Sequence, residues 1–149
     1  MNEFTRLGLS DWLVRKLDML NIKSATEVQR RVLSHLLKKD EDKEKDSRKC
    51  DIFACSPTGS GKTLAYVLPI LERLMVDPRP YFALILAPTR ELANQIHDNI
   101  KILGGHSKNS TMMLKSILVI GGGNYGVETN DQDVQGWFIF KFNIDMLIS

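Results

Sequence analysis

The sequence predicts an α/β fold in which a parallel β-sheet is flanked by helices. From residue 51 onward, short apolar segments of strand length alternate with longer segments that have helical periodicity. Turns that contain glycine or proline separate these segments, and a glycine-rich loop joins the first apolar segment to the helix that follows it. Strands and helices that alternate at this spacing are typical of a parallel sheet covered on both faces.

The composition is that of a single globular domain. The chain has 149 residues, of which 43% are hydrophobic and 26% charged, and a net charge of +2 that is too small to indicate a nucleic-acid binder. Cys50 and Cys55 lack the spacing of a redox or zinc pair, so no metal cluster or disulfide framework is predicted. Without a signal peptide or an apolar segment of membrane-spanning length, we expect an intracellular protein that is not bound to membranes.

Two helices are expected within residues 1–37. Ser10 can cap the first, whose apolar stripe is Leu13, Leu17 and Leu20. Thr26 can cap the second, whose inward residues are Val28, Val32, Leu36 and Leu37. Residues 38–49 then form a run of mixed charges, which predicts a surface loop rather than an RNA-binding tail because its net charge is close to neutral.

Residues 50–123 form the expected core of the fold. The predicted elements are a strand at 51–55, a loop at 56–63, a helix at 64–75 kinked by Pro69, a strand at 82–87, a helix at 89–103 and a strand at 116–120. Gly104 and Gly105 end the last helix, and Gly121 to Gly123 follow the last strand. Leu92, Ile96, Ile100 and Leu103 are the expected inward stripe of the helix at 89–103.

The loop between the first strand and its helix predicts a phosphate-binding site. It consists of Ser56, Pro57, Thr58, Gly59, Ser60, Gly61, Lys62 and Thr63. Glycines allow the backbone to curl so that several N–H groups converge on phosphate oxygens, and the start of the helix adds the positive end of its dipole. Lys62 would reach the terminal phosphates and Thr63 would offer its hydroxyl to Mg²⁺. The alternative is a glycine-rich turn that only caps the helix.

A second segment makes the pattern specific. Pro88, Thr89, Arg90, Glu91, Leu92 and Ala93 follow a strand and open a helix. Together with the loop, this hexapeptide resembles the DEAD-box family of ATP-dependent RNA helicases, in which Ala usually stands where Ser56 is found. The resemblance implies a partial RecA-like fold of the P-loop NTPase type, corresponding to an incomplete first helicase domain.

Asn21 to Gln29 resembles the adenine-reading Q motif of the same family. Ala25 stands in place of the usual proline, and Asn21 and Ile22 replace the usual Gly and aromatic residue. The resemblance implies that Gln29 contacts the adenine edge and that Phe4 stacks on the ring, which would select ATP over GTP. Thr26 and Gln29 also have the spacing of a capping box, which needs no ligand, and both roles can hold together.

The resemblance also implies RNA contacts. These fall on Pro88, Thr89 and Arg90 at the start of a helix and on Gly121 and Gly122 in the later turn, where exposed N–H groups can hold backbone phosphates. The alternatives are a surface arginine paired with a nearby acid and an ordinary loop after a strand. The sequence around Leu7 to Ser10 and Asp77 to Pro78 is most similar to the ribosome-assembly branch of the family. This similarity implies ribosome-assembly proteins as partners. It also implies a location in the nucleus or nucleolus, or otherwise in the cytoplasm.

The motif resemblance extends from about Phe4 to Gly122, and residues 124–149 form a tail that resembles no part of the family. The Thr-Pro-Gly-Arg, Asp-Glu-Ala-Asp and Ser-Ala-Thr segments and the second RecA-like domain are missing from the sequence. Asp145 only faintly resembles the magnesium-binding acid of the family. Residues 137–149 suggest an unspliced intron, a shifted frame or a natural short isoform. Because Phe138, Phe140 and Phe142 alternate with other residues, the tail could also supply a replacement strand.

These patterns favour one function over two others. The leading hypothesis is a truncated ATP-dependent RNA helicase that binds ATP, Mg²⁺ and RNA but lacks the groups for hydrolysis. The second is a non-catalytic regulatory fragment that binds ATP, RNA or a protein partner. The third is an unrelated P-loop kinase or NTPase, against which the segment from Pro88 to Ala93 argues.

Overall fold

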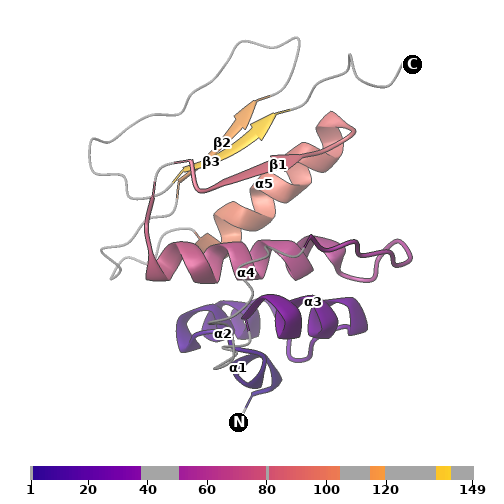
Figure 1. Ribbon diagram of the computed structural model, residues 1–149, viewed down its shortest axis with the longest axis vertical. Helices are drawn as coiled ribbons and strands as arrows, with labels where there is room; N and C mark the ends of the chain where they lie inside the picture. Colours follow the sequence, from indigo (N-terminus) through magenta and orange to yellow (C-terminus); the bar gives the residue numbers. More distant parts are fainter. Residues whose placement is uncertain (1, 38–50, 80, 105–114, 120–136, 142–149) are drawn as a thin grey trace. The chain divides into compact units, whose positions relative to one another are not determined.

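The computed structural model describes residues 2–37, 51–79, 81–104, 115–119 and 137–141. The chain divides into two compact units, Met1–Glu72 and Arg73–Ser149, and the two are described separately below. Figure 1 labels the helices and strands of both units.

The first unit contains three helices and most of a fourth. They are α1 (Glu3–Arg6), α2 (Asp11–Met19), α3 (Glu27–Leu37) and the portion of α4 (Lys62–Val76) up to Glu72. α1 was not predicted, although Asn2 is a suitable cap and accepts a hydrogen bond from the Phe4 N–H at 3.0 Å. α4 continues as one helix through Pro69.

Apolar side chains from all four helices form the core of this unit. Phe4, Leu13, Leu17, Leu33, Leu68 and Leu71 have no exposed surface. The predicted stripe of α2 is correct at Leu13 and Leu17 but wrong at Leu20, which caps the end of the helix and is 41% exposed. Ser10 is the N-cap residue of α2, as predicted, but its side chain makes no capping bond; its N–H donates to Glu72 Oε2 at 2.9 Å instead.

The predicted stripe of α3 needs a larger correction. Its buried residues are Gln29, Val32 and Leu33, while the expected Val28, Leu36 and Leu37 are only partly covered. The inward face is therefore rotated toward Gln29. A polar residue can occupy such a face because hydrogen bonds satisfy its amide, and no unsatisfied buried side-chain atom is found in the described residues.

The expected strand at residues 51–55 is not formed. Among the described residues no strand pairs with this segment, and its side chains are exposed, with Phe53 at 96%. An apolar segment becomes a strand only when a neighbour completes its backbone hydrogen bonds, so its composition alone could not determine the outcome.

The second unit contains a parallel three-stranded sheet in the order β1-β3-β2. The strands are β1 (Ala83–Leu86), β2 (Lys115–Val119) and β3 (Trp137–Lys141). β3 pairs Ala83 with Phe138 on one side and Lys115 with Trp137 on the other. The predicted parallel sheet and the replacement strand from the tail are thus both confirmed, although β3 pairs with β1 and β2 rather than with residues 51–55.

α5 (Arg90–Gly104) packs against this sheet, as Figure 1 shows. Ile96, Ile100 and Leu103 of the predicted stripe are each 1% exposed, and Leu92 is half-buried. The buried His97 lies with its Nδ1 atom 3.0 Å from the Ser116 hydroxyl of β2. Leu84 and Leu86 of β1 remain 60% and 63% exposed, so one face of the sheet is incompletely covered within this unit.

Candidate functional site

The loop before α4 has the backbone conformation that the phosphate-binding prediction requires. Gly59 and Gly61 have φ values of +77° and +85°, in the left-handed region that side chains disfavour. The Ser60 N–H donates to the Pro57 carbonyl at 3.3 Å and closes a turn, and α4 begins at Lys62 directly after the second glycine. The loop therefore curls into the start of a helix, where N–H groups without helical partners are available to an anion.

Lys62 is folded back over this loop. Its Nζ atom donates to the carbonyl oxygens of Ser56 and Pro57, both at 2.6 Å. The hydroxyls of Ser56 and Ser60 lie 2.7 Å apart on the same turn. Because the ammonium group is held only by neutral carbonyl oxygens, a phosphate offering full negative charge would compete for it.

Thr63, the expected magnesium ligand, lies in the first turn of α4. Its side chain hydrogen-bonds the Tyr66 hydroxyl. Burial raises the pKa of Tyr66 above 10.0, and the bond to Thr63 opposes this shift. No group of three or more His, Cys, Asp or Glu side chains that could hold a metal occurs among the described residues. The residues present suit Mg²⁺ bound through one hydroxyl and the phosphates of a nucleotide, rather than a cage made by the protein alone.

The side chain of Gln29 connects α3 to the phosphate loop. Its Oε1 atom accepts from the Thr26 N–H at 3.0 Å, which is the glutamine half of the predicted capping box. Its Nε2 atom donates to the Gly61 carbonyl at 3.1 Å. Gln29 is only 2% exposed, so the amide is enclosed between the start of α3 and the loop. The glutamine half of the capping box is confirmed, and contact with the loop is a role that sequence analysis missed.

Phe4 does not occupy a place where it can stack on a ligand. Its side chain has no exposed surface and is part of the apolar core of the first unit. Stacking on an adenine ring would require the phenyl group to leave that core. The structure thus assigns Phe4 to packing, and we no longer expect it to contact the base.

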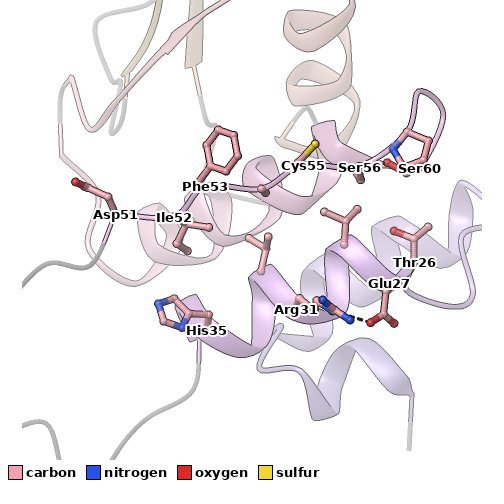
Figure 2. Close-up of a pocket in the computed structure, with 14 residues that line it drawn as sticks. Thr26, Glu27, Arg31, His35, Asp51, Ile52, Phe53, Cys55, Ser56 and Ser60 are labelled. Atoms are coloured by element: carbon pink, nitrogen blue, oxygen red, sulfur yellow. Dashed lines mark hydrogen bonds and ion pairs between the residues drawn. The ribbon is translucent and has the colours of Figure 1, made fainter.

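A cavity of about 720 Å³ lies between α3 and the segment that leads into the loop. Figure 2 shows Arg31 and His35 of α3 on one side and Asp51 to Ser56 on the other. Arg31 Nε is 2.7 Å from Glu27 Oε1, and the bond from Arg31 holds the pKa of Glu27 below its usual 4.5. Since Ser56, Pro57 and Ser60 also line this space, the cavity opens onto the phosphate loop.

An ionic network that sequence analysis missed lies at the start of α3. Glu3 Oε1 is 2.6 Å from Arg30 Nε, and Glu27 Oε2 is 3.1 Å from Arg30 Nη1. Glu3 Oε2 also accepts from the Ala25 N–H at 3.0 Å. The hydrogen bond from Arg30 is the main cause that lowers the pKa of Glu3. Helical spacing could have revealed the pairs within α3, but no local signal marks Glu3.

The expected RNA-contacting residues before α5 are accessible. Pro88, Thr89 and Arg90 are exposed at the start of this helix. The Thr89 hydroxyl accepts from the Leu92 N–H at 3.2 Å and caps the helix. Within the part of the chain that is described, Arg90 forms no ion pair, so the alternative of a paired surface arginine finds no support there. Gly121, Gly122, Asp145 and the charged run at 38–49 lie outside the described residues.

Helices in the described ranges are too short and too polar to span a membrane.

Comparison with known proteins identifies relatives across most of this chain. It is 41% identical to the human probable ATP-dependent RNA helicase DDX49 over 122 residues, which are 82% of this chain and 22% of that protein. It is 34% identical to the ATP-dependent rRNA helicase rrp3 of Schizosaccharomyces pombe, over 80% of this chain and 22% of rrp3. The chain thus spans about a fifth of these relatives.

Solved structures agree with the fold. S. cerevisiae Dbp5 bound to RNA and ADP BeF3 matches 94% of this chain at 26% identity, with a TM-score of 0.65, and the match covers 32% of the Dbp5 chain. The yeast DEAD-box splicing factor Prp28 matches 89% at 28% identity with the same TM-score, over 31% of its own chain. The fold is therefore a partial RecA-like domain, as the sequence predicted.

The profile of the DEAD/DEAH box helicase family matches residues 26–143. The match extends beyond Gly122, where the motif resemblance ends, and includes β3. Most of the chain, from the start of α3 to the replacement strand, therefore has the family's pattern, and the protein belongs to the DEAD/DEAH box helicase family.

Proposed function

We propose that this chain is the nucleotide-binding front part of an ATP-dependent RNA helicase. The observation that carries the proposal is the conformation of the phosphate loop, where two glycines with positive φ lead into α4 and Lys62 lies across the turn. This arrangement presents N–H groups and an ammonium to an anion at a helix start. The names of the relatives supply the reaction class, and the ADP BeF3 bound to Dbp5 is consistent with a nucleoside triphosphate as ligand.

The proposed ligand is ATP with Mg²⁺. Lys62 would exchange its two carbonyl partners for phosphate oxygens, and the loop residues Ser56, Thr58, Gly59, Ser60 and Gly61 would surround the phosphates. Thr63 would release its bond to Tyr66 to coordinate Mg²⁺. The bonds to Thr26 and Gly61 use one acceptor lone pair and one N–H donor of the Gln29 amide. Gln29 would read the adenine edge with its remaining N–H and its remaining lone pair.

RNA is proposed to bind at the exposed start of α5. Pro88, Thr89 and Arg90 would meet backbone phosphates there, with Gly121 and Gly122 supplying further N–H groups, and such contacts hold RNA without reading its sequence. The relative named as an rRNA helicase makes ribosomal RNA the proposed substrate class of the whole protein, with ribosome-assembly proteins as partners and the nucleolus as the place of action.

A regulatory fragment without turnover is the second candidate. These 149 residues contain no Asp-Glu-Ala-Asp segment, whose acids would hold magnesium during phosphoryl transfer. One observation favours this candidate: β3 lies between β1 and β2 and gives the partial domain a parallel sheet of its own. We therefore propose that the isolated chain binds ATP but does not hydrolyse it.

The test is ATP binding by the purified chain in the presence of Mg²⁺. Lys62→Ala should abolish binding, whereas Arg15→Ala, which removes an equal charge from an exposed position of α2, should not. Gln29→Ala should be measured with both ATP and GTP. A loss of ATP preference would support adenine reading, and an equal loss for both nucleotides would show that Gln29 acts only through the loop.

Phosphate release with and without RNA should be followed in the same samples. ATP binding without release would support the non-hydrolysing fragment. Release that depends on Lys62 would refute it, and failure of the folded wild-type chain to bind ATP would overturn the proposed function as a whole.

A further inference from the structure

Glu3 makes two long-range contacts from the short helix α1. Its Oε2 atom accepts a hydrogen bond from the Ala25 N–H, 22 residues away, and its Oε1 atom accepts one from Arg30, 27 residues away. Both partners lie in the same unit as Glu3. One carboxylate therefore holds the backbone just before α3 as well as a side chain in the first turn of that helix.

These contacts continue to the phosphate loop. Ala25 is followed by Thr26, whose N–H donates to Gln29 Oε1, and Gln29 Nε2 donates to the Gly61 carbonyl. Only the φ and ψ dihedrals of Ala25 separate its N–H from the N–H of Thr26, so anchoring Ala25 limits how far the N–H of Thr26 can move. Ala25 and Gln29 are 3% and 2% exposed, which leaves water little access to replace these bonds.

The contact between Gln29 and Gly61 is tightly packed. A Cβ atom placed on Gly61 would lie 2.4 Å from Gln29 Nε2 and 3.3 Å from the Thr26 hydroxyl. The amide of Gln29 thus touches the backbone of the loop, one residue before Lys62. Displacement of the segment at residues 25–26 would move this amide and, with it, the carbonyl of Gly61.

We propose that Glu3 is a positioning residue for the phosphate loop. It acts through Ala25, Thr26 and Gln29 to fix the orientation of Gly61 and therefore the direction in which Lys62 leaves the loop. Glu3 does not touch the nucleotide. The inference rests on the proposed ATP-binding function, but the effect of Glu3 on the conformation of the phosphate loop can be tested without ATP.

The two contacts of Glu3 differ in importance. Arg30 keeps a second carboxylate partner in Glu27, so loss of Glu3 does not leave the guanidinium unpaired. The N–H of the buried Ala25, in contrast, would lose its acceptor. The hydrogen bond to Ala25 is accordingly the contact that matters, and Glu3→Gln, which keeps an acceptor oxygen but removes the charge, should preserve most of the effect.

The experiment measures ATP affinity and the backbone amide resonances of the ligand-free chain. Glu3→Ala should weaken ATP binding about fivefold, the effect of one net hydrogen bond. It should also shift the amide resonances of Gly61 and Lys62, which a purely local change at α1 would leave in place. Asp77→Asn is the matched control, because it removes one negative charge from an exposed pair confined to a turn.

A double-mutant cycle with Gln29→Ala gives the decisive comparison. If Glu3 acts through Gln29, Glu3→Ala should cause little further loss of ATP affinity when Gln29 is already alanine. Additive losses, or a lowered melting temperature with unchanged Gly61 and Lys62 resonances, would overturn the proposal. If the wild type binds no ATP, the proposed function fails, and the resonances in Glu3→Gln and Glu3→Ala still decide whether Glu3 positions the loop.

Discussion

Replacing Gly61 by alanine should disrupt the loop more than replacing Gly59, although both glycines have positive φ values. Strain from a side chain at such a φ costs roughly 1–2 kcal/mol at either position. At Gly59 the new methyl group would meet nothing within 4 Å. At Gly61 it would lie 2.4 Å from Gln29 Nε2, so the buried amide would have to move.

Movement of that amide breaks the bonds to Gly61 and Thr26, each worth about 0.5–1.5 kcal/mol. We therefore expect Gly61→Ala to lower the free energy of unfolding by about 1–3 kcal/mol more than Gly59→Ala. Urea denaturation followed by far-ultraviolet circular dichroism would measure the difference. Gln29→Ala removes the clashing atoms, so the excess cost should vanish in the Gly61→Ala/Gln29→Ala pair. Equal destabilisation by the two glycine substitutions would refute the close contact between Gly61 and Gln29.

Three further predictions follow from burial and charge. Phe4→Ala should cost about 3–5 kcal/mol of unfolding free energy, whereas the milder Phe4→Leu should leave ATP affinity as in the wild type, because the ring belongs to the core; a selective loss of ATP binding in Phe4→Leu would restore the stacking role. The pKa values of Glu3 and Glu27 are lowered in the folded protein, so these groups contribute stability that is present above their ordinary value of 4.5 and is lost as the pH falls through the lowered values. The thermal melting temperature should therefore drop below pH 4.5. The drop should be smaller in the double variant Glu3→Gln/Glu27→Gln. The pKa of Tyr66 should lie above 10.0 in a spectrophotometric titration, in which Tyr66→Phe identifies its signal. Thr63→Val should raise the pKa of Tyr66 further, because the opposing hydrogen bond is lost. An unchanged pKa in Thr63→Val would show that the two hydroxyls are not bonded.

Local sequence patterns predicted the elements whose stability is mostly local. The helical stripe of α5 follows from the spacing of Ile96, Ile100 and Leu103, and the turn before α4 follows from Gly59 and Gly61. The strand expected at residues 51–55 failed for the opposite reason: strand formation depends on a pairing partner elsewhere in the chain. Periodicity also misplaced the buried face of α3, because hydrogen bonds rather than hydrophobicity account for the burial of Gln29.

The sequence also predicted only part of the candidate site. The positive φ values of Gly59 and Gly61 and the position of Lys62 at the start of α4 could be predicted because the loop is a continuous segment with a fixed spacing. The contact between Gln29 and Gly61 spans 32 residues and that between Glu3 and Ala25 spans 22, and neither leaves a spacing that sequence alone would indicate. Phe4 was misassigned because an aromatic residue suited to stacking is equally suited to a core, and only its accessibility distinguishes the two roles.

The capping and adenine-reading roles of Gln29 are chemically compatible but not geometrically independent. A side-chain amide has two N–H donors and two acceptor lone pairs, and the bonds to Thr26 and Gly61 use one of each. One donor and one acceptor therefore remain for an adenine edge. Because only 2% of Gln29 is exposed, the base must gain access to them without loss of the contacts that position the amide. Glu3 is proposed to favour ATP binding through its contact with Ala25, so by reciprocity ATP binding should strengthen the protection of the Ala25 amide from hydrogen exchange. Weaker protection in the presence of ATP would indicate that the base binds by moving the segment before α3 outward, and this would contradict the proposed role of Glu3.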